Sequence, residues 1–111
     1  MSIKLNKYEK DWQIAFAVSS YRYGGGLAIE MYSVGEDYPE MFSMLTVNLE
    51  DFPTEENRAF VDTNNLSDEI IDWIIENNLG ELTGRIGLSG YCSYPEVKFN
   101  LDEINKHLLE D

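Results

Sequence analysis

The sequence has few of the residues on which catalytic and metal sites most often depend. Its 111 residues include one cysteine, Cys92, and one histidine, His107. A single cysteine excludes an internal disulfide and a paired-cysteine metal motif, and no cysteine or acid stands at a zinc-ligand spacing from His107. We therefore predict no metal and no cofactor, a surface position for His107 in the last turn of the final helix, and a small buried side chain at Cys92.

Long apolar runs are also missing. Crossing a bilayer takes about 20 apolar residues, and every apolar run of this sequence is much shorter. The N-terminal stretch MSIKLNKYEKDW contains lysines but not the apolar core of a secretory signal. We therefore expect a cytoplasmic protein that forms a single domain over residues 1–111, as is usual for a chain of this length.

Basic residues are also few in this sequence. The chain has 8 lysines and arginines against 21 acids, which gives a net charge of −13. Between Glu30 and Glu81 there are fourteen acids and one base, Arg58. A field of this sign repels nucleic acids and anionic membranes, so we expect neither as a direct partner. An electrostatic partner should be a basic protein surface or a metal ion, and the plain alternative is that the charge serves solubility alone.

Three consecutive glycines, in the stretch YRYGGGLAIEMY from Tyr21 to Tyr32, raise the question of a phosphate-binding loop. Phosphate loops place their glycines between a strand and the start of a helix. Here apolar and polar residues alternate on both sides of the glycines, in WQIAFAVS before them and LAIEMY after them. A period of two indicates strands. We therefore predict a β-hairpin whose tip holds Gly24–Gly26.

Further strands are predicted along the chain. Residues 41–49 alternate, with Leu45, Val47 and Leu49 on one face, and short strands are predicted at 59–63 (AFVDT) and 94–99 (YPEVKF). Consecutive strands with short links favour an antiparallel meander. The glycines at positions 84, 87 and 90 indicate turns and bulges in a less regular stretch.

Two helices follow from the remaining patterns. The stretch LSDEIIDWIIENNLG predicts a main helix over about residues 67–78, with Ser67 as its N-cap and Gly80 as its stop. Asn100 and Glu103 resemble a capping box, which predicts a short C-terminal helix over about 101–109. The predicted fold class is α+β: an antiparallel meander sheet of four to five strands, with the main helix packed on one face.

Candidate chemical sites are weak. Asp62, Asn64 and Asp68 offer oxygen ligands, but the stretch lacks the glycine and closing glutamate of a calcium loop. A turn in which Asp and Asn side chains bond their own backbone explains it better. Adjacent acids lie in polar loops, whereas acid–base catalysis needs one dry and one wet carboxylate. We therefore predict no catalytic residue, no metal site and no enzyme activity.

Tyrosines and acids gather around the hairpin and the loops after it. Tyrosine contributes strongly at protein interfaces, and arginines of a partner pair with acids and stack on aromatic rings. The alternative is ordinary cross-strand packing of the tyrosines. The predicted partner-binding residues are Tyr21, Tyr23, Tyr32, Glu36, Asp37, Tyr38, Glu40, Glu50, Asp51, Glu55 and Glu56.

Three segments carry a resemblance to a known family: AFVDTNN, the helix with Trp73 and Leu79-Gly80, and SGYCSYPEVKF. Over roughly residues 12–100 the chain resembles an uncharacterised family of small acidic proteins carried on plasmids and conjugative elements of Gram-positive bacteria. That family has no established active site, so the resemblance carries over no catalytic residue. It implies a mobile-element setting, in which small acidic proteins often inhibit host defence by occupying the nucleic-acid groove of a nuclease.

Two functions are therefore weighed. The first is a non-catalytic acidic protein that binds a basic nucleic-acid-binding surface of a nuclease, as an anti-restriction or anti-CRISPR inhibitor does. The second is a module that binds a small molecule or a cation, at the tyrosine-rich hairpin or the Asp62 turn.

Overall fold

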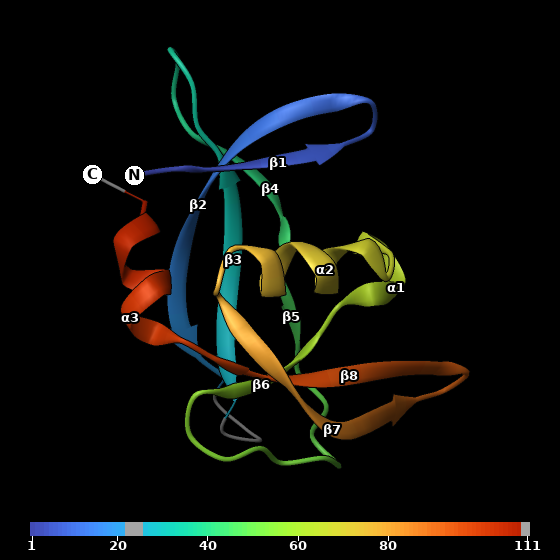
Figure 1. The fold of residues 1–111 in the computed structure, drawn as a ribbon. Helices are drawn as coiled ribbons and strands as arrows, with labels where there is room; N and C mark the ends of the chain where they lie inside the picture. Colours follow the sequence, from blue (N-terminus) through green and yellow to red (C-terminus); the bar gives the residue numbers. More distant parts are fainter. Residues whose placement is uncertain (22–25, 110–111) are drawn as a thin grey trace.

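The first half of the chain forms an antiparallel meander in the computed structural model, which describes residues 1–21 and 26–109 (Figure 1). Strands β1 (Ile3–Lys7), β2 (Lys10–Ser20), β3 (Leu27–Ser33) and β4 (Glu40–Met44) lie side by side in chain order. The antiparallel pairing of β2 with β3 confirms the predicted hairpin, and the Tyr21 N–H donates to the Gly26 carbonyl at 3.0 Å. Gly24 and Gly25 lie outside the described residues.

A second four-stranded sheet contains β5 (Thr46–Val47), β6 (Arg58–Val61), β8 (Cys92–Phe99) and β7 (Gly80–Ser89), in that order. The prediction of one sheet was therefore wrong. The predicted strand over 41–49 divides at Leu45, where the chain leaves one sheet for the other. The Leu45 N–H donates to the Ile29 carbonyl of β3 at 2.8 Å, and the Leu45 carbonyl accepts from the Asp62 N–H at 3.0 Å. One buried residue thus connects both sheets.

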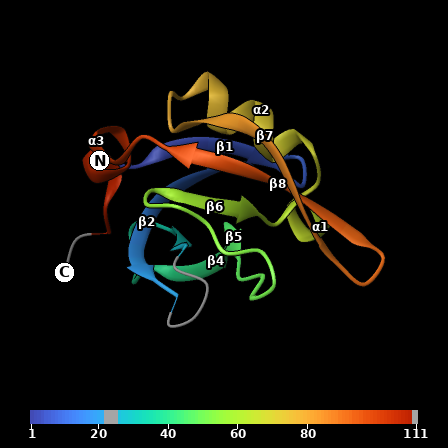
Figure 2. The ribbon, with the colours of Figure 1, turned by 90° about the horizontal axis from the view of Figure 1, so that it is seen from below.

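The hydrophobic core contains side chains from both sheets and from helix α2 (Glu69–Glu76). Figure 2 shows β6 and β8 side by side, with α2 beside β7 on one side of them and β2 and β4 on the other. Alternation along β2 and β3 places Phe16, Ile29 and Met31 in this core, fully buried. The opposite sheet contributes Val97 and Phe99.

The predicted main helix is shorter than expected and begins differently. A separate turn, α1 (Thr63–Leu66), precedes α2, and the Asp62 carboxylate caps it by accepting the Asn65 N–H at 3.3 Å. Ser67 has a φ of 66° and lies between the two helices, so its prediction as N-cap was wrong. The reason is that the Asp62 side chain starts the helical path one turn earlier.

The end of α2 also corrects a prediction. Asn78, with a φ of 58°, ends the helix, since its N–H donates to the Ile75 carbonyl and the Leu79 N–H donates to the Ile74 carbonyl. Gly80 is the first residue of β7. A Cβ there would lie 2.6 Å from Val97 Cγ1, so glycine allows β7 to approach β8 closely.

The C-terminal helix begins where it was predicted. The Asn100 side chain accepts the Glu103 N–H at 3.4 Å and caps α3 (Leu101–Ile104), which continues as the 3₁₀ turn η1 (Asn105–His107). The helix ends before residue 109 because the chain becomes extended at Leu108 and the Leu109 N–H donates to the Phe16 carbonyl at 2.7 Å. In the part of the chain that the structure describes, no helix combines the length and apolar content that a membrane crossing requires.

Candidate interaction surfaces

The predicted partner-binding acids fall into two separate groups. Glu36, Asp37, Tyr38 and Glu40 are exposed at the connection between β3 and β4, which projects at the top of Figure 1. The second group lies in the loop between β5 and β6, at the bottom of the same view, and consists of Glu50, Asp51, Glu55 and Glu56. The fold therefore does not bring the two groups into one patch.

The tyrosines of the same prediction have different surroundings. The Tyr21 hydroxyl forms a hydrogen bond with the Thr46 hydroxyl at 2.9 Å, and burial raises the pKa of Tyr21. The Tyr32 hydroxyl donates to the Glu30 carboxylate at 2.6 Å, and this bond raises the pKa of Tyr32. Both hydroxyls are thus held within the chain. Tyr23 lies outside the described residues.

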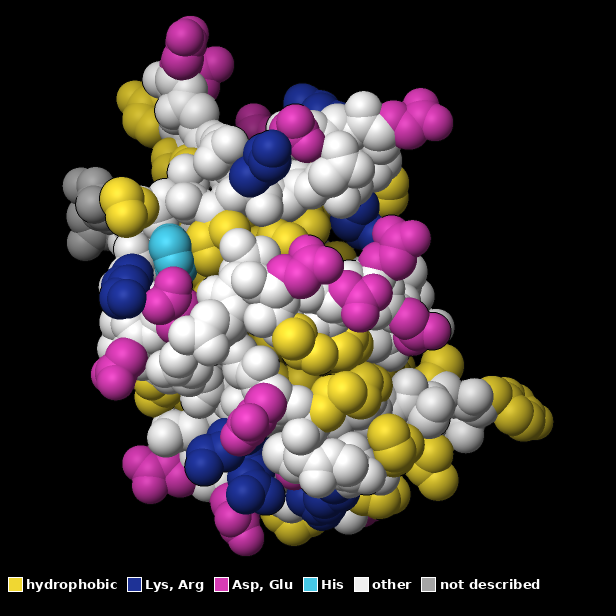
Figure 3. Space-filling model, viewed as in Figure 1, with side chains coloured by type: hydrophobic (Ala, Val, Ile, Leu, Met, Phe, Trp, Pro, Cys, Tyr) yellow, Lys and Arg dark blue, Asp and Glu magenta, His cyan; other side chains and the backbone are white. Residues whose placement is uncertain are grey.

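A third acidic group lies on α2 and is not among the predicted partner-binding residues. Asp68, Glu69, Asp72 and Glu76 are exposed, and we call them the acidic face of α2. Asp68, Asp72 and Glu76 stand four residues apart, and residues at this spacing on a helix lie about 6 Å apart along its axis. Figure 3 shows acidic side chains gathered over α2. Within the described residues, only Glu55, Glu96 and Glu103 form an ion pair with a base. No residue of the acidic face is therefore in an ion pair, although Lys4 and Lys7 of β1 line the same groove as Glu69, Asp72 and Glu76.

Two carboxylates of the described residues are buried: that of Asp62, which is 8% exposed, and, more deeply, that of Glu96 on β8. The exposed fraction of Glu96 is 1%. The Thr83 hydroxyl donates to Oε1 at 2.7 Å, and Arg85 Nη1 donates to Oε2 at 3.1 Å. Arg58 Nη1 lies 3.7 Å from Oε1. The sequence places Glu96 between two apolar residues of a strand but does not indicate which cations would reach it, because Arg58 and Arg85 come from two other strands.

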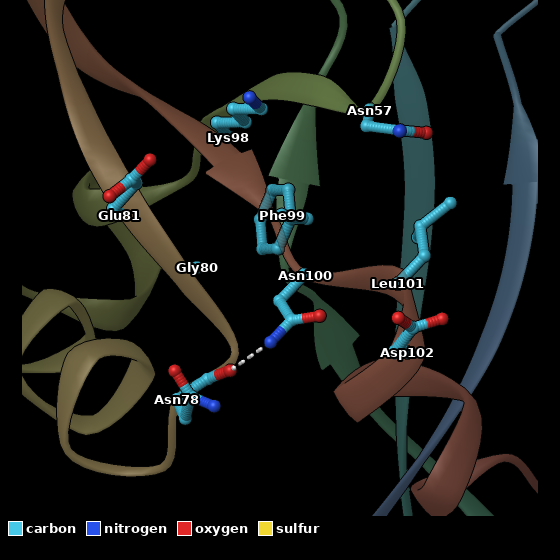
Figure 4. A pocket seen from close by; sticks show the side chains of 9 residues that line it. All are labelled: Asn57, Asn78, Gly80, Glu81, Lys98, Phe99, Asn100, Leu101 and Asp102. Atoms are coloured by element: carbon cyan, nitrogen blue, oxygen red, sulfur yellow. Dashed lines mark hydrogen bonds between the residues drawn. The ribbon is translucent and has the colours of Figure 1, made fainter.

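A polar cavity of about 470 Å³ opens where β6, β7, β8 and α3 meet (Figure 4). The Asn100 amide donates to the Asn78 carbonyl at 3.3 Å within it. Its side chains can bond a small polar ligand, but none of the predicted site residues lies there. The lining residues are Asn57, Asn78, Gly80, Glu81, Lys98, Phe99, Asn100, Leu101 and Asp102.

The Asp62 turn is occupied by its own chain. Asp62 Oδ1 accepts the Asn65 N–H, and Oδ2 accepts the Asn65 amide at 2.8 Å. This confirms the interpretation as a turn bonded by Asp and Asn side chains. Over residues 1–21 and 26–109, no three His, Cys, Asp or Glu side chains are grouped closely enough to hold a metal ion.

Cys92 and His107 lie at opposite sides of the molecule. Cys92 begins β8 beside the tip of the β7–β8 hairpin, and η1 carries His107 at the other side of Figures 1 and 2. The His107 side chain is only 12% exposed, because Nδ1 bonds the Met1 carbonyl at 2.9 Å and Nε2 lies 3.5 Å from the Glu103 carboxylate. His107 thus lies at the surface as a half-buried side chain, and Cys92 is half-buried rather than buried.

A family model matches most of the chain. It is described as a domain of unknown function, DUF4313, and it covers residues 15–111. No curated protein and no solved structure matches this chain.

Proposed function

Since the chain belongs to the DUF4313 family, whose function is unknown, we propose a function for it from the chemistry of its surface. The protein acts without catalysis and binds the basic, nucleic-acid-binding surface of a partner protein. Its exposed carboxylates take the place of phosphates against lysines and arginines of that partner. The partner is a nuclease or another nucleic-acid-binding protein, encountered in the cytoplasm, and the setting is a mobile element whose product inhibits host defence.

The observation that carries this proposal is the lack of internal compensation for the negative charge. The net charge is −13, and the ion pairs of the described residues use three carboxylates, on Glu55, Glu96 and Glu103. The acidic face of α2 and the acids at the β3–β4 connection have no such partner within the described chain. Unpaired surface charge steers association with a partner of opposite sign and accelerates it.

The surroundings of the reactive residues support a role without catalysis. A nucleophilic cysteine needs a base within hydrogen-bond reach, and Cys92 and His107 lie on opposite sides of the fold. Of the two buried carboxylates among the described residues, Asp62 already bonds Asn65, and Glu96 already bonds Thr83 and Arg85. Its oxygens are therefore engaged in holding β7 against β8.

The test is affinity capture followed by competition. The immobilised protein is exposed to a bacterial lysate at low salt, and captured proteins are released with duplex DNA or with added salt. The proposal expects nucleic-acid-binding proteins, released by both treatments, because DNA and the carboxylates compete for the same cations. An Asp68→Asn/Asp72→Asn variant should capture less of them. Capture that DNA does not reverse, or the absence of any basic protein from the eluate, contradicts the proposal.

A second candidate function is favoured by the polar cavity beside Asn100. Its amides and its charged side chains, Glu81, Lys98 and Asp102, suit a small polar molecule or a cation. A thermal-shift screen of metabolites and divalent cations tests it, because a ligand raises the unfolding temperature by mass action. A shift that disappears in Lys98→Ala but persists in Lys4→Ala would favour this function over the first. A panel without any shift counts against it.

A further inference from the structure

One side of β7 carries three exposed apolar residues. Leu82, Ile86 and Leu88 are 49%, 50% and 58% exposed. They pair with Val97, Pro95 and Ser93 of β8, which follow one another at every second position and therefore share one side of the sheet. Residues 83–85 form a β-bulge opposite Glu96, and this bulge keeps Leu82 on the same side as the other two.

This side of the sheet faces the core further along β8. Val97 and Phe99, on the same side, are buried in the core cluster. The hairpin continues past the core, so Ile86 and Leu88 stay at least half exposed. On α2, Ile75 is 50% exposed as well. Figure 3 shows the hydrophobic side chains as a band that runs from α2 across β7 toward the hairpin tip. We call Ile75, Leu82, Ile86 and Leu88 the apolar band.

A continuous apolar surface on so charged a chain is typical of a protein interface. The charges around the band decide which partner suits it. Asp72 and Asp68 stand three and seven residues before Ile75, so they lie on the same side of α2 as this residue. The cations nearest the band on β6 and β7, Arg58 and Arg85, are paired with Glu96. The free charge beside the band is therefore negative.

That charge argues against a second copy as the occupant. Pairing two bands would bring two α2 acidic faces, on chains of charge −13 each, toward one another. The edge of β7 is also a poor template for an added strand, because the bulge at 83–85 interrupts it. A helix is better suited, since α2 already packs beside β7 and neighbouring helices lie about 8–10 Å apart.

We propose that the apolar band is the docking site for a basic amphipathic helix of the partner protein. The apolar face of that helix covers Leu82, Ile86 and Leu88, and its lysines or arginines meet Asp68 and Asp72. Apolar anchors at the centre with charges at the rim are the usual division of labour in interfaces. This inference rests on the proposed function and assigns it a partner element.

The probe is a fluorescent synthetic helix of leucine and lysine, with leucines at every third or fourth position, and the readout is anisotropy at low salt. The protein should bind this helix at least about tenfold more tightly than a peptide of the same composition in shuffled order. The Ile86→Ser/Leu88→Ser variant should bind it about tenfold less tightly. The matched control is Met41→Ser on β4, where Met41 is 49% exposed, and it should bind like the parent.

The variants separate this inference from the proposed function. If Asp68→Asn/Asp72→Asn weakens binding but Ile86→Ser/Leu88→Ser does not, charge alone attracts the probe and the docking site is wrong. If neither variant weakens binding, the docking site is wrong and the proposed function is weakened as well. If the ordered helix binds no better than the shuffled one, only the docking site is wrong. A dimer in sedimentation experiments that the Ile86→Ser/Leu88→Ser change dissolves would assign the band to a second copy instead. Far-ultraviolet circular dichroism checks that each variant is folded, and Leu82→Ser serves as a replacement if the double variant is not.

Discussion

The carboxylate of Glu96 lies 3.1 Å from the guanidinium of Arg85, across the β-bulge of β7. Gly84 lies between Thr83 and Arg85, the two bulge residues that bond Glu96. Its φ of 89° is a backbone conformation that residues with a side chain rarely adopt. Arg85 also donates to the Pro53 carbonyl at 2.6 Å. The buried carboxylate thus fixes the shape of the bulge, and through it the side of the sheet on which Leu82 lies.

Removing the buried carboxylate should therefore be costly. Glu96→Ala leaves Thr83 without its acceptor and removes the counter-ion of Arg58 and Arg85, whose side chains are 31% and 41% exposed, so we expect the free energy of unfolding to fall by about 1–3 kcal/mol. Urea denaturation measures this. Lys98→Ala, an exposed neighbour on the same strand, should change it by less than about 0.5 kcal/mol. Equal effects of the two substitutions would mean that the Glu96 cluster does not stabilise the fold.

Two glycines of β7 should not tolerate a methyl group. A Cβ at Gly87 would lie 2.5 Å from Leu49 Cδ1 and 2.9 Å from Phe60 Cε1, and Gly80 is equally enclosed by Val97. Gly87→Ala should destabilise the protein by about 1–3 kcal/mol, because packed neighbours must move. Gly35→Ala is the control, since a methyl group there would meet no atom within 4 Å beyond its chain neighbours, and the change should be neutral or slightly stabilising. Thermal unfolding of both variants checks the difference.

The helix start can be assigned by substitution. Asp62→Ala removes the α1 cap and should cost about 1 kcal/mol. Ser67 makes no cap and has a φ of 66°, so Ser67→Gly should stabilise the protein by up to about 1 kcal/mol through relief of backbone strain. A loss of stability in Ser67→Gly comparable to that of Asp62→Ala would restore Ser67 as the N-cap.

The Tyr21 hydroxyl should ionise late. Burial raises the pKa of Tyr21 above its usual value of 10.0. The folded state therefore holds this proton more tightly than the unfolded state, so its contribution to stability is complete below pH 10 and is lost as the pH rises through the folded-state pKa. Alkaline difference spectra of the protein against Tyr21→Phe should show a tyrosinate signal centred above pH 10. A signal centred below that pH would contradict the burial of this hydroxyl.

Local signals in the sequence were sufficient for part of this fold. The alternation around Phe16 and Ile29 predicts the β2–β3 hairpin, and Asn100 predicts the start of α3, because both depend on neighbours within a few residues. The passage from one sheet to the other at Leu45 was not predictable in the same way. It depends on backbone bonds to Ile29 and Asp62, which no local pattern specifies.

The candidate surfaces could likewise be predicted from the sequence only in part. Exposed acids are visible in the sequence, yet their separation into three groups depends on where the loops and α2 lie in space. The apolar band was hidden because glycines 84, 87 and 90 made the stretch around Ile86 look irregular, whereas the structure forms a continuous strand there. Gly84 lies in the bulge that Glu96 stabilises, and β7 pairs regularly with β8 on both sides of this bulge.

The salt dependence of binding to a captured partner tests the central claim most directly. The dissociation constant is measured at several salt concentrations for the parent protein, for Asp68→Asn/Asp72→Asn, and for Glu9→Gln/Asp11→Asn as a matched change of two exposed acids at the β1–β2 turn. Our account predicts that affinity falls steeply as salt rises, and that the α2 variant has both a weaker affinity and a shallower slope than the other two. Affinity that does not change with salt would contradict the claim that free carboxylates bind a basic partner.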